Sequence, residues 1–136
     1  MKYRFLEHTA DIKFQAYGKN LEEVFENCGL ALLKSIYSGK IKEIQKKEIK
    51  ISGKDTENLL YNFLEEFLFL FDSKKFLVAK IKKLKIDEKK LKIQCTLIGD
   101  SSERYEIETS IKAVTYNEMF VKKEKGNWIA QVVLDV

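Results

Sequence analysis

Histidine-dependent catalysis in this chain would rest on one residue, because His8 is the only histidine among 136 residues. A serine or cysteine nucleophile would need His8 as its base, and no Ser or Cys stands in a catalytic sequence context. The six glycines never cluster into a GxGxxG or Walker-type phosphate loop. We therefore expect a protein that is not an enzyme and has no catalytic residues.

Two internal segments carry polar side chains that could form a site. The first is His8-Thr9-Ala10-Asp11, which lies between two segments of strand character. An aspartate in such a connection often just bonds nearby backbone amides, and that alternative stays open here. The second is Lys112-Ala113-Val114-Thr115-Tyr116-Asn117. Taken alone, it predicts a strand with Lys112 and Thr115 on the exposed face.

The third candidate is the apolar, β-branched segment that ends in Leu134-Asp135-Val136. We expect it to dock as a strand, which places the Asp135 carboxylate beside the α-carboxylate of Val136. Like charges this close repel unless a cation or a basic side chain intervenes. Hard oxygen ligands suit Ca²⁺ or Mg²⁺, whereas zinc prefers His and Cys. A solvated chain end without an ion is the alternative.

The elements that position these residues follow from hydrophobic periodicity. A period of two predicts strands, and apolar spacings of three and four predict helices. Asn20, three residues before Glu23, and Asp55 or Thr56 are expected helix caps. The expected order is strands Tyr3–Leu6 and Ile12–Tyr17, helix Asn20–Ile36, strand Ile49–Ile51, helix Asp55–Phe71, strands Phe76–Ile86, Leu91–Ile98 and Ile111–Lys122, a turn at Gly126-Asn127, and strand Trp128–Leu134.

This order predicts an α+β fold of mostly antiparallel or mixed β-sheets, with two main helices packed on one face. Residues 1–136 are expected to form a single domain, since 45% hydrophobic residues and nine Phe supply a core without disulfides. Cys28 and Cys95 are then reduced core thiols. No segment has the roughly 20 apolar residues that span a bilayer or the features of a signal peptide, so a cytoplasmic location is expected.

The net charge of +4 is unevenly distributed. Residues Lys74–Lys92 hold nine lysines against Asp87 and Glu88, so the other 16 basic and 19 acidic residues sum to −3. A lysine-rich pair of strands could contact tRNA weakly or meet an acidic partner. The same lysines would also be expected on a solvated strand face, where they discourage edge-to-edge aggregation. The segment holds no arginine and few aromatic side chains for stacking on bases.

Taken together, these segments resemble the archease family. His8-Thr9-Ala10-Asp11-Ile12 is similar to the family's HTAD-[IV] signature, and Lys112 to Tyr116 looks like its KAVTY segment. Asp55, followed by Leu59 and Leu60, resembles the start of its central helix. Val133-Leu134-Asp135-Val136 looks like its terminal pattern. Order, spacing and length all fit, so the resemblance covers essentially the whole chain.

The resemblance implies a metal-binding accessory protein that activates the RtcB-type RNA ligase of tRNA splicing. Activation would promote the ligase's guanylylation and so its multiple turnover. The implied metal ligands are Asp11, Asp135 and the terminal group of Val136, with Ca²⁺ the expected cation and Mg²⁺ the alternative. Site-supporting or partner-contacting roles are implied for His8, Thr9, Lys112, Thr115 and Asn117.

One position departs from the family pattern. Archeases commonly have His after KAVTY, and here the residue is Asn117, which cannot exchange a proton near neutrality. Two rival functions also remain: a tRNA- or protein-binding, chaperone-like module that modulates tRNA-modifying enzymes through Lys74–Lys92, and a metal-dependent hydrolase using Asp11, Asp135 and His8. The first predicts salt-sensitive binding of tRNA, and the second predicts turnover without the ligase.

Overall fold

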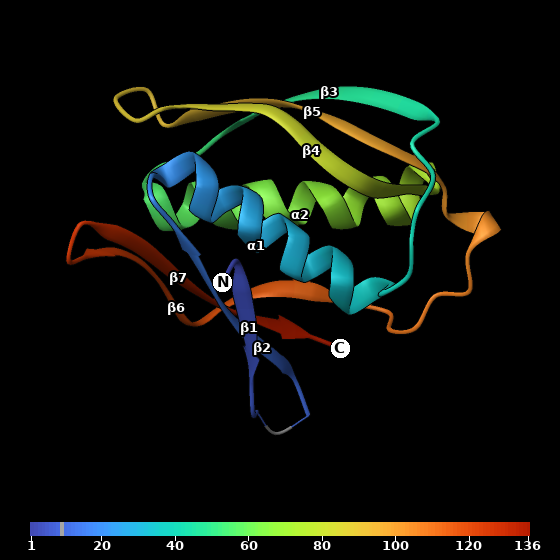
Figure 1. The fold of residues 1–136 in the computed structure, drawn as a ribbon, viewed down its shortest axis with the longest axis horizontal. Helices are drawn as coiled ribbons and strands as arrows, with labels where there is room; N and C mark the ends of the chain where they lie inside the picture. The colour runs from blue at the N-terminus through green and yellow to red at the C-terminus, as the bar shows by residue number, and fades with distance from the viewer. Residues whose placement is uncertain (9) are drawn as a thin grey trace.

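Two antiparallel β-sheets enclose two α-helices in the computed structural model, which describes residues 1–8 and 10–136 (Figure 1). Thr9, an expected site residue, lies outside the described residues. The helices α1 and α2 lie between the two sheets, and each helix contacts both of them. The helices therefore cover one face of each sheet, and the expected α+β fold is confirmed.

The first sheet has four strands in the order β1-β2-β7-β6, and the second has three in the order β3-β5-β4. All pairings are antiparallel. In chain order the elements are β1 (Tyr3–Leu6), β2 (Ile12–Gly18), α1 (Leu21–Ile36), β3 (Gln45–Ser52), α2 (Thr56–Lys74), β4 (Phe76–Asp87), β5 (Lys92–Ser101), the 3-10 turn η1 (Ser102–Arg104), β6 (Ala113–Glu124) and β7 (Asn127–Asp135).

Both helices begin where the side-chain caps were expected. Asn20 accepts a hydrogen bond from the backbone N–H of Glu23 at 2.8 Å, and Asp55 accepts one from Asn58 at 2.7 Å. Each bond satisfies an amide that has no partner inside the helix. Glu23 in turn accepts from the N–H of Lys19 at 2.9 Å, one residue earlier than in a standard capping box. Local sequence therefore determines where the helices start.

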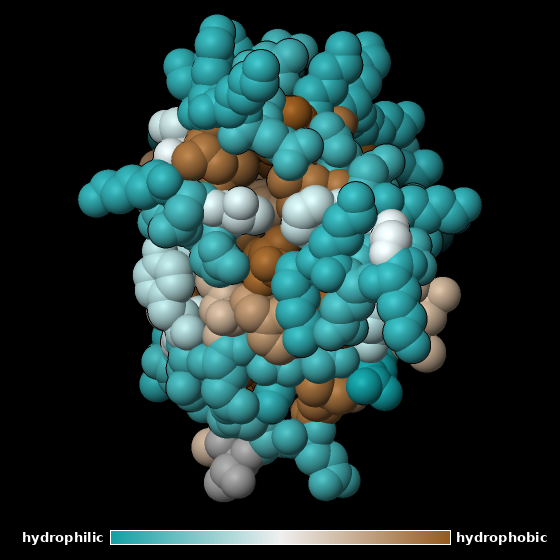
Figure 2. All heavy atoms as spheres, turned by 90° about the vertical axis from the view of Figure 1, so that its left-hand side faces the viewer, coloured by the Kyte–Doolittle hydropathy of each residue, from teal (hydrophilic) through white to brown (hydrophobic). Residues whose placement is uncertain are grey.

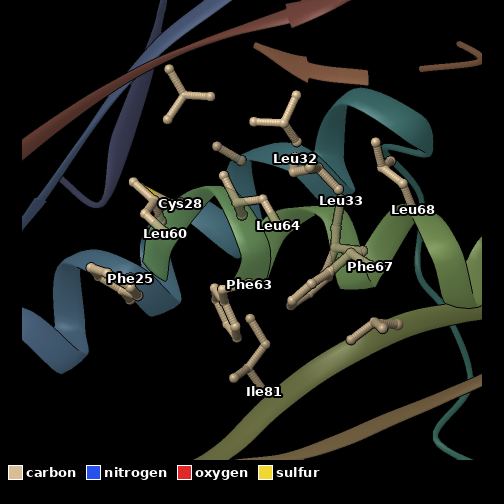
Figure 3. Packing of buried hydrophobic residues seen from close by; sticks show 14 of the residues in the cluster. Phe25, Cys28, Leu32, Leu33, Leu60, Phe63, Leu64, Phe67, Leu68 and Ile81 are labelled. Atoms are coloured by element: carbon tan, nitrogen blue, oxygen red, sulfur yellow. The ribbon is translucent and has the colours of Figure 1, made fainter. Parts of the chain in front are cut away.

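The two helices and both sheets share one hydrophobic core (Figure 3). The apolar row of α2 that includes Phe63 and Phe67 is fully buried between α1 and the second sheet. Phe25 of α1 packs on Phe63 at a ring-centroid distance of 6.0 Å, and Phe63 packs edge-on against Phe67 at 5.0 Å. Burying rings of this size contributes much of the hydrophobic driving force for folding.

Three details refine the expectations. Cys28 and Cys95 are unpaired and buried as predicted, and burial together with the charge of Glu26 raises the pKa of Cys95 to about 12. The last hairpin turns at Lys125-Gly126 instead of Gly126-Asn127, with positive φ at both residues. In the part of the chain that the structure describes, the helices are too short or too polar to cross a membrane.

Candidate functional site

Strand pairing brings the early connection and the end of the chain to the same edge of the first sheet. Ile12 of β2 is paired with Leu134 of β7, so Asp11, one residue before, and Asp135, one residue after, lie at neighbouring strand ends. On the other side of β7, Asp135 is paired with Ala113 of β6. The sequence suggested this convergence only through the family resemblance, and the register supplies it directly.

The last two residues are held in place by backbone and core contacts. The N–H of Lys112 donates to the carbonyl oxygen of Asp135 at 2.8 Å. Leu134 is fully buried, and the side chain of Val136 is half-buried against the core. Because side chains alternate along a strand, the exposed Asp135 carboxylate points to the face that the helices do not cover.

The oxygens at this edge fit a hard cation by their chemistry. Asp11 and Asp135 are the donor type that Ca²⁺ and Mg²⁺ prefer. Within residues 1–8 and 10–136, Asp135 enters no ion pair with a basic side chain, and Asp11 pairs only with His8, at 3.8 Å. No cluster of three or more His, Cys, Asp or Glu side chains that could hold a metal occurs among those residues. A complete site would therefore need further oxygens, such as backbone carbonyls, a chain-terminal carboxylate or water.

His8 is positioned by a glutamate that the sequence did not indicate. Its Nε2 lies 3.0 Å from Oε2 of Glu118, and Lys13 donates to the other carboxylate oxygen of Glu118 at 3.0 Å. The hydrogen bonds from Lys13 and His8 lower the pKa of Glu118. An ionised carboxylate can only accept, so Nε2–H of His8 is the donor in this contact. The Nδ1 of His8 is buried, faces Asp11 and has no hydrogen-bond partner among the described residues.

A bulge in β6 is what aims Glu118 at His8. The register between β6 and β7 shifts between Thr115 and Phe120, and Glu118 has the left-handed φ of 55°. The side chain of Gln131 donates to the carbonyl oxygen of Glu118 at 2.8 Å and accepts from Gln15 at 2.9 Å. The side-chain amides of Gln131 and Gln15 thus connect the bulge to β7 and β2.

Of the remaining expected residues, Thr115 and Asn117 lie in β6, and Lys112 immediately precedes it. The hydroxyl of Thr115 donates to the carbonyl oxygen of Val133 at 2.9 Å and accepts from the N–H of Asn117 at 3.3 Å. The Thr115 hydroxyl is therefore used to hydrogen-bond main-chain groups at the start of the bulge. The side chains of Lys112 and Asn117 are exposed, and neither makes a side-chain hydrogen bond in the described part of the protein.

Helix α2 supports the same strand from the other side. Glu65 accepts a hydrogen bond from the N–H of Val114 at 2.8 Å, which occupies a donor on the outer edge of β6. Tyr61 stacks on Tyr116 with ring centroids 4.3 Å apart, and Asn58 donates to the Tyr116 hydroxyl at 2.7 Å. The bulge is therefore held between α2 and the sheet.

The sequence matches the archease protein family model (MTH1598/TM1083) over residues 3–136. It is 41% identical to the protein archease of Methanosarcina mazei, with 99% of this chain and 96% of that protein covered. Identity to the protein archease of Sulfurisphaera tokodaii is 38%, with 99% of each chain covered. The archease-like protein of Drosophila melanogaster is 34% identical, with 100% of this chain and 91% of that protein covered.

Two solved structures are similar to this chain in both fold and sequence. The solution structure of protein 1598 of Methanobacterium thermoautotrophicum superposes with a TM-score of 0.83 at 35% identity, covering 98% of each chain. The crystal structure of an archease, described as a possible chaperone, from Thermotoga maritima superposes with a TM-score of 0.69 at 25% identity, covering 96% of this chain and 94% of the other.

Proposed function

The chain belongs to the archease family, and on that premise we propose that it is a non-enzymatic, metal-binding activator of an RtcB-type RNA ligase. The activator promotes guanylylation of the ligase and its multiple turnover. The observation that carries this proposal is the convergence of Asp11 and Asp135 at neighbouring strand ends, with His8 beside Asp11.

The proposed ligands are the carboxylates of Asp11 and Asp135 and the main-chain carboxylate of Val136, with Ca²⁺ preferred over Mg²⁺. A bound cation would supply the positive charge that lets these anions lie close together. Asp11 precedes β2 and Asp135 ends β7, so a cation bound to the three groups would tie the connection after β1 to the last strand. With the cation bound, this edge of the sheet would form one fixed surface, which also includes Lys112 and Thr115.

The chain's own residues favour presentation of a surface over proton transfer. Asn117 replaces the family's usual histidine, and its exposed amide cannot exchange a proton near neutrality. The ring of His8 is held by Glu118, a neighbour with a lowered pKa, so His8 orients the connection to Asp11. We expect the ligase's own active site to carry out all of the covalent chemistry.

The test is a reconstitution of the ligase with labelled GTP, with and without this protein at substoichiometric amounts. Asp11→Ala should abolish Ca²⁺ binding, measured against a fluorescent calcium indicator, and also stimulation of guanylylation, with an unchanged circular dichroism spectrum. Asp72→Ala removes an exposed carboxylate from α2 and serves as the matched control, with both activities retained.

Two results would contradict the proposal. If Asp11→Ala stimulates the ligase as well as the unmodified protein, the metal site has no part in activation. If the unmodified protein does not increase guanylylation at all, the chain is not an activator of this ligase. Hydrolysis of a phosphodiester by this protein alone would instead favour the metal-dependent hydrolase.

A further inference from the structure

The outer face of the sheet β3-β5-β4, which points away from the helices, forms a second, chemically different surface. It lies at the top of Figure 1, and in Figure 2, which views the molecule from the side, the upper part is mostly hydrophilic, with a few hydrophobic groups between. The paired register identifies the residues that share this face. Its exposed members are Lys46, Glu48, Lys50, Ser52, Lys80, Lys82, Lys85, Asp87, Lys92 and Gln94.

Most of the positive charge on this face has no partner. Six lysines oppose two acidic residues, Glu48 and Asp87. Among residues 1–8 and 10–136, only Lys80 of the six enters an ion pair, with Glu43 at 3.1 Å. Asp87 accepts hydrogen bonds from the N–H groups of Lys89 and Lys90, at 3.1 and 3.0 Å, so its carboxylate serves the hairpin turn. The face therefore has an excess of exposed, unpaired ammonium groups.

Three of the six lysines, Lys50, Lys85 and Lys92, border a groove at the hairpin end of the sheet. The groove has a volume of about 740 Å³, and its lining combines Lys50, Lys85, Lys90 and Lys92 with Asp87 and with the core-packed Ile51, Ile86 and Ile93. Gln94 of the central strand is paired with Lys50 on one side and Lys85 on the other. Neighbouring strands lie about 4.8 Å apart, so these two lysines start about 10 Å from one another, with a neutral amide between them.

The composition of the face selects the kind of partner. A protein–protein interface usually has apolar or aromatic side chains at its centre. The one large apolar residue that the register places on this face, Ile98, is only 7% exposed, so the face offers no such centre. Single-stranded nucleic acid would be expected to stack on aromatic rings, and the described positions of the face hold none. Lysine point charges around hydrogen-bonding amide and hydroxyl groups instead suit a regular phosphate backbone with 2′-hydroxyls.

We propose that the outer face of the sheet β3-β5-β4 binds the phosphate backbone of double-helical RNA, without sequence specificity. The choice of RNA over DNA rests on the proposed function, because the substrate of that ligase is an RNA. The edge of the other sheet that carries Asp11 and Asp135 would then engage the ligase while this face holds a helical part of its substrate. The two surfaces belong to different sheets, so each can be altered without the other.

The experiment measures binding of the isolated protein to a fluorescent RNA duplex of about 16 base pairs. Anisotropy titrations at about 50 mM and about 200 mM salt should show a steep loss of affinity, because binding releases counterions. The triple variant Lys50→Glu, Lys85→Glu, Lys92→Glu should bind at least about tenfold more weakly and reduce the salt slope by about 2–3. The control triple variant, Lys2→Glu, Lys19→Glu, Lys123→Glu, has the same net charge but alters other surfaces and should change affinity by less than about threefold.

The outcomes separate this proposal from the proposed function. Equal loss in both triple variants would mean that net charge alone attracts RNA, and the proposal would be overturned. Tighter binding of single-stranded RNA, of DNA duplex or of a polyglutamate peptide than of the RNA duplex would also overturn it. In a guanylylation assay that contains no RNA, the Lys50, Lys85, Lys92 variant should stimulate the ligase fully. Asp11→Ala should show the opposite behaviour, with intact RNA binding and no stimulation.

Discussion

Glu118 connects three segments of the chain through one side chain. Its two carboxylate oxygens contact His8, before β2, and Lys13, within β2, while its backbone belongs to β6. The hydrogen bonds from Lys13 and His8 lower the pKa of Glu118 below its ordinary value. A carboxylate whose pKa is lower in the folded state stabilises that state while it is ionised.

Replacing Glu118 with Gln should therefore destabilise the protein in a pH-dependent way. Above the pKa of an unfolded glutamate, about 4.3, the original protein should melt at a higher temperature than the variant. This advantage should disappear as the pH falls through the lowered folded-state pKa, because Glu118 then binds a proton. Thermal melts with a calcium chelator present measure the difference across the acid range. A difference that stays constant with pH would contradict the assignment.

The carboxylates of Asp11 and Asp135 could be predicted as site candidates from the sequence, but the residues that support them could not. Asp11 and Asp135 stand in short polar or terminal contexts that draw attention to carboxylates. Glu118 reads instead as one of several charged residues on a strand, and it reaches His8 only because a bulge turns it aside at φ 55°. Bulges depend on pairing with a distant strand, which no local pattern encodes.

At the scale of elements, the two-residue turn Lys125-Gly126 shows how local chemistry determines a hairpin. Glu124 and Asn127 are paired, so the loop has two residues, and both have positive φ (50° and 83°). This is the conformation of a type I′ turn, for which Asn-Gly is the favoured pair because Asn tolerates the left-handed region. Lys125 occupies that position at a conformational cost.

Changing Lys125 to Asn should stabilise the hairpin β6–β7. Relief of about 0.5–1 kcal/mol at a left-handed position is expected, which corresponds to a melting temperature higher by roughly 2–4 °C. The same substitution at Lys123, two residues earlier on the regular strand, should give no gain, since Asn is disfavoured in strands. Calorimetry of both variants measures the contrast, and a gain at Lys123 as well would point to charge as the cause.

Element order was predictable because its signals are local. The helix caps Asn20 and Asp55 act within one turn, and the strands of the hairpin β4–β5 alternate clearly. The start of β3 could not be predicted in this way. The strand begins at Gln45, although its clear alternation starts only at Ile49. Lys46 and Lys47 belong to the strand because they are paired with Ile98 and Leu97 of β5, which lie far away along the chain. Tertiary pairing, and not propensity, sets that boundary.

Across the whole molecule, the packing of two helices between two sheets depends on a glycine. A Cβ atom at Gly29 of α1 would lie 2.6 Å from Cδ1 of Ile81 in β4 and 3.2 Å from Cζ of Phe67 in α2. The missing side chain therefore lets α1 approach both the second sheet and its partner helix. Helical propensity alone would favour Ala here by about 1 kcal/mol.

Gly29→Ala should accordingly destabilise the fold by about 1–3 kcal/mol from overpacking, less the gain in helical propensity. Ile81→Val removes the methyl group nearest to the added Cβ. The double variant should thus be more stable than the sum of the single effects by about 0.5–3 kcal/mol, measured by denaturant unfolding. Simple additivity would show that another contact, such as Phe67, limits the approach.

The last strand should separate stability from function in two adjacent residues. Leu134 is fully buried, so Leu134→Ala should cost about 2–5 kcal/mol of unfolding free energy. Asp135 is exposed, so Asp135→Ala should change that free energy by less than about 0.5 kcal/mol in a chelator while reducing Ca²⁺ affinity. Chemical denaturation and calcium titration of the two variants provide the comparison. A large loss of stability in Asp135→Ala would instead make it a structural residue.

The division into two sheets was the global property that the sequence did not reveal. Strand-like segments such as Phe76–Ile86 and Trp128–Leu134 have the same alternation, and nothing local assigns them to different sheets. The family resemblance supplied the convergence of the two ends, which periodicity alone does not indicate. Partner choice is set by the packing of both sheets on the helices, and so belongs to the whole chain.

The position of β7 has a consequence for the order in which the protein can form during synthesis. β7 is the last strand in the chain but lies inside its sheet, between β2 and β6. The ribosome delivers α1, α2 and the whole sheet β3-β5-β4, whose strands are contained in residues 45–101, before it delivers β7. Until then, the edge of β2 that pairs with β7 has no partner strand. Pairing of β2 with β7 closes a loop of more than a hundred residues. Until β7 emerges, the unpaired edge of β2 is thus available for pairing with a wrong strand.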